Sequence, residues 1–61
     1  MPKFYSVVFN VGLRDTIPLK VQRQAEGDVE MFEAATKEAK ELDAKLHKTV
    51  SVKSITQQGV N

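Results

Sequence analysis

The stretch FYSVVFNV, residues 4–11, constrains the fold of this chain more than any other segment. Its β-branched and aromatic residues favour a strand, in which successive side chains point to opposite faces. On one face they form an apolar row, made by Tyr5, Val7, Phe9 and Val11. Phe4 and Val8 fall on the other face, so we expect this strand, over residues 3–11, to lie in the centre of a sheet.

A second strand is predicted over residues 17–23, where IPLKVQR alternates apolar and polar side chains. Gly12 and Asp15 mark the loop that joins it to the first strand as a hairpin. Pro18 has no amide hydrogen to donate to a neighbouring strand. We therefore expect this strand at an edge of the sheet, with position 18 facing outward.

A helix is predicted over residues 28–48. Apolar residues recur there at spacings of three and four, which places them on one face, and Phe32 among them is expected in the core. This face comprises Val29, Phe32, Ala35, Ala39, Leu42 and Leu46. Carboxylates dominate the first turns and basic residues the last, as the helix dipole favours.

A third strand is predicted over residues 49–56, TVSVKSIT. Its two valines share a face, but Ile55 falls out of step with them. Either a β-bulge near Lys53 returns Ile55 to the core, or Ile55 belongs to another surface. Residues 57–61 are predicted to be a frayed tail.

These elements assemble into a single small α+β domain of ββαβ topology. A right-handed return through the helix places the third strand beside the first, which gives a three-stranded, mainly antiparallel sheet in the order 2-1-3 with one long helix on one face. Under the helix we expect the apolar row of the first strand together with Ile17, Leu19, Val21, Val50 and Val52. The open face is expected to present Phe4, Ser6, Val8, Asn10, Pro18, Lys20, Gln22, Ser51 and Lys53, and Ile55 if no bulge forms.

Composition excludes several classes of site. The chain of 61 residues has no cysteine, which rules out disulfides and thiolate zinc sites. His47 is the single histidine and the glycines are isolated, so we expect no enzyme activity, no cofactor and no bound metal. No apolar run reaches the roughly 18 residues of a membrane span, and Ser6 and Asn10 interrupt the stretch that resembles a signal peptide. A cytoplasmic protein without a membrane partner is expected.

Charge is unevenly distributed along the chain, despite a total of +1. Residues 28–48 hold six carboxylates and four lysines, whereas the remainder holds Asp15 and Glu26 against five basic residues. The basic residues outside the helix are Lys3, Arg14, Lys20, Arg23 and Lys53. This pattern predicts a basic sheet layer and an acidic helix layer, which can steer an anionic partner toward the sheet.

The open face supports three hypotheses. In the first, the chain forms a homodimer or higher homo-oligomer, because a domain this small buries little core alone. The interface residues would be Phe4, Ser6, Val8, Gln22 and Ile55. In the second, the five basic residues outside the helix contact the phosphates of a nucleic acid and Phe4 stacks on a base, in a regulatory or accessory role. In the alternative to nucleic acid, the face or an edge strand binds a host protein as a modulator or inhibitor, of the kind that phages and mobile elements use.

Overall fold

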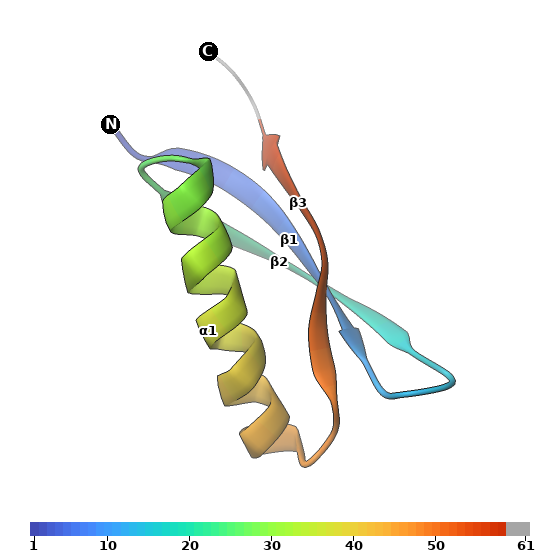
Figure 1. Cartoon of the computed structure of the whole chain (residues 1–61). Helices are drawn as coiled ribbons and strands as arrows, with labels where there is room; N and C mark the ends of the chain where they lie inside the picture. The colour runs from blue at the N-terminus through green and yellow to red at the C-terminus, as the bar shows by residue number, and fades with distance from the viewer. Residues whose placement is uncertain (59–61) are drawn as a thin grey trace.

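Three strands and one helix follow one another in the predicted order in the computed structural model, which describes residues 1–58 (Figure 1). They are β1 (Lys3–Val11), β2 (Ile17–Ala25), α1 (Asp28–Leu46) and β3 (Val50–Gln58). The strands form one antiparallel sheet in the order β2-β1-β3, and α1 lies against one side of it. The α+β class, the ββαβ topology and the central place of β1 are thereby confirmed.

β1 and β2 pair without interruption along all nine residues of each strand. Pro18 lies on the outer strand opposite Asn10, as predicted. In the loop between the strands, Gly12 has a φ of 113°, and a Cβ there would lie 3.1 Å from the Asp15 carbonyl oxygen. Glycine adopts such a positive φ without strain and has no Cβ to make this close contact. The Gly12 N–H donates to the Thr49 carbonyl oxygen at 2.8 Å, which ties the hairpin loop to the start of β3.

β3 pairs with β1 on either side of a β-bulge, where the register shifts between Val8 and Phe9. The pairs that flank the shift are Val8 with Ser54 and Phe9 with Val52. Lys53 is therefore the inserted residue. Beyond it, Ile55 lies opposite the buried Val7 and packs against the core. The bulge alternative is confirmed, and Ile55 does not lie on the open face.

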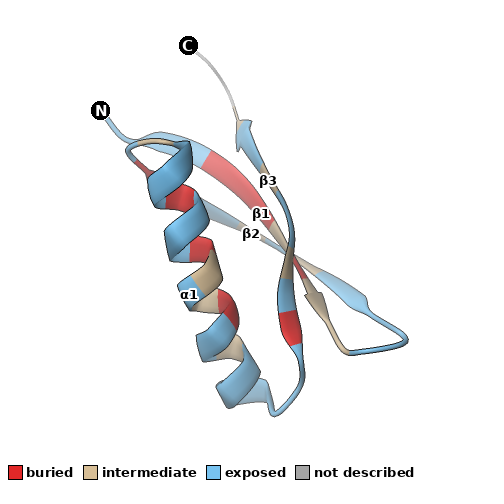
Figure 2. Cartoon of the chain, in the orientation of Figure 1, coloured by how far each residue is buried: buried red, intermediate tan, exposed pale blue. Residues whose placement is uncertain are grey.

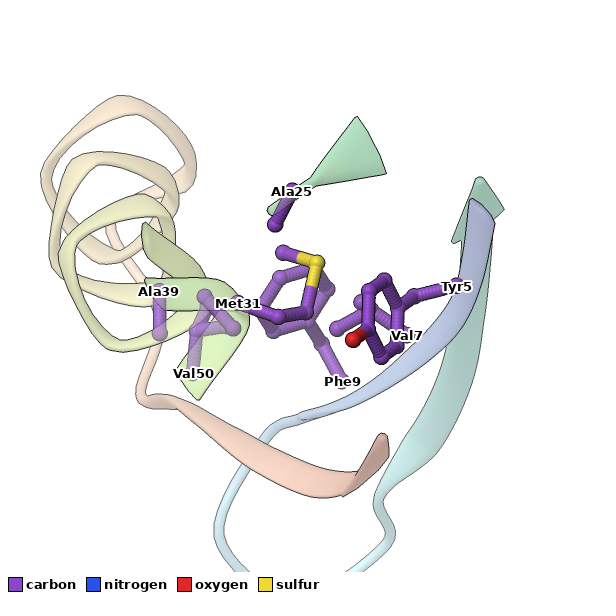
Figure 3. Close-up of a cluster of buried hydrophobic side chains, with 8 residues drawn as sticks. Tyr5, Val7, Phe9, Ala25, Met31, Ala39 and Val50 are labelled. Atoms are coloured by element: carbon purple, nitrogen blue, oxygen red, sulfur yellow. The ribbon is translucent and has the colours of Figure 1, made fainter. Parts of the chain in front are cut away.

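Buried hydrophobic residues gather between the sheet and α1 (Figure 2). They are Tyr5, Val7, Phe9, Ala25, Met31, Ala35, Ala39 and Val50. In Figure 3 the side chains of Tyr5, Val7 and Phe9 point from β1 toward Met31 of α1. The predicted inner row of β1 is confirmed for these three residues, and Val11, at the end of the strand, is half-buried.

The rotation of α1 about its axis differs from the prediction. Met31 is 1% exposed, whereas Phe32 is 60% exposed and Val29 is also exposed. The prediction that Phe32 and Val29 belong to the core is therefore wrong. The inner face of the helix consists of Met31, Ala35 and Ala39, with Leu42 packed beside them.

Two apolar stripes overlap on this helix, which explains the error. Both stripes contain Ala35 and Ala39, and they differ in whether Met31 or the pair Val29 and Phe32 precedes them. Successive side chains on a helix are separated by roughly 100° of rotation, so burying Met31 turns Phe32 away from the centre of the sheet. Leu46 lies at the end of both stripes and is exposed, at the margin of the core.

The helix ends two residues earlier than predicted. His47 adopts a left-handed conformation, with φ 56° and ψ 38°, and this stops α1 at Leu46 rather than at Lys48. At the other end, Gly27 precedes the helix in extended conformation, and the Met31 N–H donates to its carbonyl oxygen at 3.0 Å. This is the first i→i−4 bond of α1, and because glycine has no side chain, the free N–H groups of the first turn have no side-chain cap at this position.

The strands also differ slightly from their predicted bounds. β2 continues to Ala25, and β3 begins at Val50 and continues to Gln58. Gln57 and Gln58 therefore belong to a strand, and the prediction of a frayed tail is wrong for these two residues. The rest of the predicted tail, residues 59–61, lies outside the described residues.

The helix crosses the sheet diagonally, from the end of β2 to the start of β3 (Figure 1). Along β2, burial increases from Ile17, which is 65% exposed, to Ala25, which is 4% exposed. Along β3, burial decreases from the buried Val50 to the exposed Gln57. The prediction that Ile17 lies under the helix is therefore wrong. Two opposite corners on the helix side of the sheet, the start of β2 and the end of β3, are left uncovered.

The rotation of α1 can be tested with two neighbouring substitutions. Met31→Ala should lower the free energy of unfolding by about 2–4 kcal/mol, because it opens a cavity in the core. Phe32→Ala should cost less than about 1 kcal/mol, because the ring is already largely in water. Urea unfolding followed by circular dichroism measures both values. A larger loss for Phe32→Ala than for Met31→Ala would contradict the observed rotation.

Candidate binding surfaces

The face of the sheet opposite α1 is not covered by any other described element. The register of the three strands assigns twelve positions to this face. They are Phe4, Ser6, Val8 and Asn10 of β1, Pro18, Lys20, Gln22 and Gln24 of β2, and Ser51, Ser54, Thr56 and Gln58 of β3. We call this set the open face. Eight of these positions were predicted, whereas Gln24, Ser54, Thr56 and Gln58 were not. Of the other predicted residues, Lys53 lies at the bulge and Ile55 lies against the core.

The apolar part of the open face is small. Phe4 is 54% exposed and Val8 is half-buried. Ser6 lies between them along β1 and is buried, with Gln22 and Thr56 opposite it on the two neighbouring strands. The structure thus brings together four of the residues predicted for an interface. Two of them, Phe4 and Val8, form an apolar spot whose neighbours are neutral polar side chains and Lys20.

The strands of the sheet carry no carboxylate. All eight Asp and Glu residues of the chain lie in α1, in the hairpin loop or in the connection between β2 and α1. The strands carry four basic residues, Lys3, Lys20, Arg23 and Lys53. The uneven charge along the sequence therefore becomes a separation in space, with the carboxylates outside the sheet.

Arg23 does not contribute its charge to the open face. It lies on the helix side of β2, opposite Tyr5, and forms a two-point ion pair with Glu38 of α1. Its Nε donates to Oε1 at 3.0 Å and its Nη2 to Oε2 at 2.6 Å. The bond to Glu38 raises the pKa of the guanidinium, which stays charged and paired. Arg23 is thus a link between β2 and the helix.

The other predicted phosphate contacts do not form one cluster. Lys3 begins β1, Arg14 lies in the hairpin loop and Lys53 is the bulge residue of β3. Lys20 lies within the open face, opposite Val8. Of the five basic residues predicted to contact phosphates, the structure therefore places Lys20 inside the open face and the others at its ends, at its bulge or on the helix side.

A second surface lies at the uncovered corner beside the end of β3. A shallow hollow of about 320 Å³ opens there between the first turns of α1 and the last residues of β3. It is lined by Tyr5, Asp28, Phe32, Ile55 and Gln57, and we call it the α1–β3 hollow. Sequence analysis misses this surface because it assigns Phe32 to the core. The second apolar stripe of the helix, which contains Met31, could have indicated that Phe32 lies outside the core and is exposed.

Tyr5 and Asp28 form a hydrogen bond at the base of the α1–β3 hollow. The Tyr5 hydroxyl donates to Oδ1 of Asp28 at 2.9 Å. Burial raises the pKa of the phenol, and the bond to Asp28 and the negative charges of Asp28 and Glu30 raise it further. A phenol with a pKa above 10 is protonated at neutral pH, so Tyr5 acts there as a hydrogen-bond donor that holds the start of α1.

No metal centre is formed by residues 1–58, in which no group of three or more His, Cys, Asp or Glu side chains could hold an ion. Asp43, the carboxylate closest in sequence to His47, accepts a hydrogen bond from the Val50 N–H at 3.3 Å. His47 itself forms the left-handed end of α1. Over the same described range, no helix has the length and apolar character needed to cross a membrane.

Comparison with other proteins assigns no family to this chain. No protein-family model, no curated protein and no solved structure matches it. The functional interpretation therefore rests on the open face and the α1–β3 hollow.

The environment of Tyr5 can be tested by titration, because Tyr5 is the chain's one tyrosine and there is no tryptophan. We expect absorbance at 295 nm to show a pKa above the usual value of about 10. Because the folded-state pKa is the higher one, Tyr5 stabilises the fold fully below pH ~10, and this contribution is lost as the pH rises through the folded-state pKa.

Asp28→Asn provides the control for this titration. The variant should lower the pKa of Tyr5 without returning it to the ordinary value, since burial is the largest cause of the shift. A titration of the folded wild-type protein at or below the pKa of free tyrosine would contradict the buried, hydrogen-bonded position of Tyr5.

Proposed function

We propose that this protein is a non-enzymatic binding module of the cytoplasm whose open face binds single-stranded nucleic acid in a regulatory or accessory role. The observation that carries the proposal is the absence of any carboxylate from the strands, which hold four basic residues. A phosphate backbone that approaches the open face meets no negative group on the sheet. The six carboxylates of α1 lie on the other side.

Phe4 supplies the stacking group of the proposed site. Its ring is exposed on the open face, and stacking on a base contributes about 1–3 kcal/mol whatever the base. The neutral side chains around it, such as Gln24 and Gln58 directly opposite, can donate and accept hydrogen bonds. Lys20 within the face and Lys53 at the bulge provide the contacts to phosphates.

Such a site neutralises few phosphates, and this limits its expected affinity for nucleic acid. Lys20 and Lys53 amount to two contacts, because Lys3 pairs with the buried Ala25 and shares the helix-side parity of Tyr5. Each contact on a single strand contributes about −0.7 to the slope of log affinity against log salt concentration, so a slope of about −1.4 is expected. Binding should therefore be weak and should fall moderately with salt.

Fluorescence anisotropy with a labelled oligothymidylate, at two salt concentrations, tests the proposal. Lys20→Glu should weaken binding at least about tenfold, equivalent to about 1.4 kcal/mol, because it places a negative charge inside the open face. Phe4→Ala should weaken binding by a similar factor through the loss of stacking. Both substitutions change exposed side chains, so the fold is retained.

Matched controls come from the helix layer. Lys37→Glu changes an exposed lysine of α1, and Phe32→Ala removes the exposed ring on that side; neither should alter the affinity. Arg23→Gln should also leave it unchanged, and it should lower the free energy of unfolding by at most about 1 kcal/mol, because the pair with Glu38 is partly exposed. Binding without salt dependence, or equal losses for Lys20→Glu and Lys37→Glu, would reject the proposal.

The second candidate function is binding of a protein through the open face. The partner would be another copy of this chain or, alternatively, a host protein that the module inhibits. The observation that favours it is the apolar spot of Phe4 and Val8 inside a polar surface. Protein interfaces combine such an apolar centre with a polar rim. A chain of this mass buries only about 60% of its unfolded surface, so association would add stability.

Light scattering over a range of concentrations tests the self-association case. We expect a mass above 6.8 kDa that rises with concentration, and Phe4→Asp should return it to the mass of one chain. Val29→Asp alters an exposed apolar residue of α1 and is the control that should leave association unchanged. A mass of 6.8 kDa at every concentration would exclude a homo-oligomer.

A further inference from the structure

We infer that the α1–β3 hollow and the free edge of β3 form a second binding site, which takes an extended peptide segment of another protein with one apolar and one basic residue two positions apart. The site lies at the edge and on the helix side of the sheet. Its side-chain contacts lie on the helix side, away from Phe4 and Lys20 of the open face, and it adds a protein partner to the nucleic acid proposed above.

The backbone of β3 is the first half of this site. β3 pairs with β1 along one edge, and no other described strand lies along its second edge. The outer strand β2 carries Pro18, Lys20 and Arg23, which oppose the addition of a further strand. From Ser54 to Gln58, β3 has neither proline nor charge. An extended peptide can add there as a fourth strand, held by main-chain hydrogen bonds.

The hollow supplies the second half, a place for side chains of the added strand. Ile55 and Gln57 lie on the helix side of β3, opposite Val7 and Tyr5. Alternate side chains of a strand added beside β3 would lie next to them. Phe32 forms the facing wall, with its ring largely exposed. An apolar side chain of the peptide would lie between Ile55 and Phe32 and remove both from water.

The end of the hollow near Gln57 is acidic. Tyr5 lies opposite Gln57 and donates to Asp28, which places the Asp28 carboxylate at this end. Glu30 lies close enough for its charge to act on the Tyr5 hydroxyl. Within residues 1–58, neither Asp28 nor Glu30 has a basic partner. A lysine or arginine of the peptide is therefore the side chain that complements this end.

The spacing of the recognised residues follows from β3. Ile55 and Gln57 are two residues apart, so the apolar and the basic residue of the peptide must also be two apart to share the helix side. Addition of the strand in the opposite direction keeps this spacing and reverses the order. A second copy of β3 would offer isoleucine and glutamine at these positions and no positive charge, so charge favours another protein as the partner.

Labelled synthetic peptides test the inference. The probes are acetylated STLTRTS and STRTLTS, which carry the two orders, and STLTETS and STETLTS, in which glutamate replaces arginine. We expect one arginine peptide to bind at least about tenfold more tightly than its glutamate partner. N-methylation of alternate amides in that peptide should abolish binding, because it blocks the main-chain bonds to β3. The amide resonances of residues 54–58 should shift most on binding.

Variants of the protein separate the two halves of the hollow. Asp28→Asn keeps an acceptor for Tyr5 and should reduce the preference for arginine to less than about twofold, whereas Glu33→Gln removes another carboxylate of α1 and should leave it unchanged. Phe32→Ala should weaken binding of the arginine peptide, and Phe4→Ala should not. The same Phe4→Ala variant impairs the proposed nucleic-acid site, so the failure of one site is distinguishable from the failure of the other.

Several results would overturn the inference. Equal affinity for the arginine and glutamate peptides would reject the role of Asp28, and unchanged affinity after N-methylation would reject strand addition. Shifts confined to the β1 and β2 residues of the open face, or no binding of any peptide, would reject the site itself. Shifts of residues 54–58 that depend on protein concentration without peptide would assign the edge of β3 to a second copy of the chain.

Discussion

The contact between the inner face of α1 and the buried row of β1 supports every other feature of this structure. Ala35 and Ala39 have short side chains, so the helix backbone can lie close to the sheet. Met31 is flexible and unbranched and fills the space above Tyr5, Val7 and Phe9, as Figure 3 shows. The small core buries no unsatisfied side-chain polar group among the described residues.

One helix cannot cover a twisted sheet of three strands, and both candidate surfaces result from this limit. The face opposite α1 remains open, with a neutral polar character, an exposed Phe4 and Lys20. On the helix side, the diagonal path of α1 leaves the corner at the end of β3, where the α1–β3 hollow lies. The two surfaces differ in charge: the strands carry no carboxylate, whereas Asp28 lines the hollow. They therefore suit different partners.

Sequence reasoning succeeded where a residue's position depends on backbone geometry. The alternation along β1 follows from the period of two in a strand, and the edge position of Pro18 follows from its missing amide hydrogen. The same period of two showed that Ile55 is out of step, which left a bulge at Lys53 as one of two alternatives. Sequence reasoning failed for Phe32, because two apolar stripes overlap on the same helix and the one that holds Phe32 faces away from the core. It also grouped Arg23 with the phosphate contacts, although its parity with Val21 already placed it on the helix side. The ion pair of Arg23 with Glu38 could not be predicted, because it depends on the rotation of α1 about its axis.

The pattern of residues along the chain was sufficient to predict the fold class, the order of the strands and the separation of charge between sheet and helix. These properties follow from local periodicity, from the missing amide hydrogen of Pro18 and from where the carboxylates occur. The rotation and path of α1 required contacts between residues far apart in the sequence, namely Met31 with β1, Tyr5 with Asp28 and Arg23 with Glu38. No local pattern encodes such contacts. They decide which side chains stay exposed, and hence where a partner can bind.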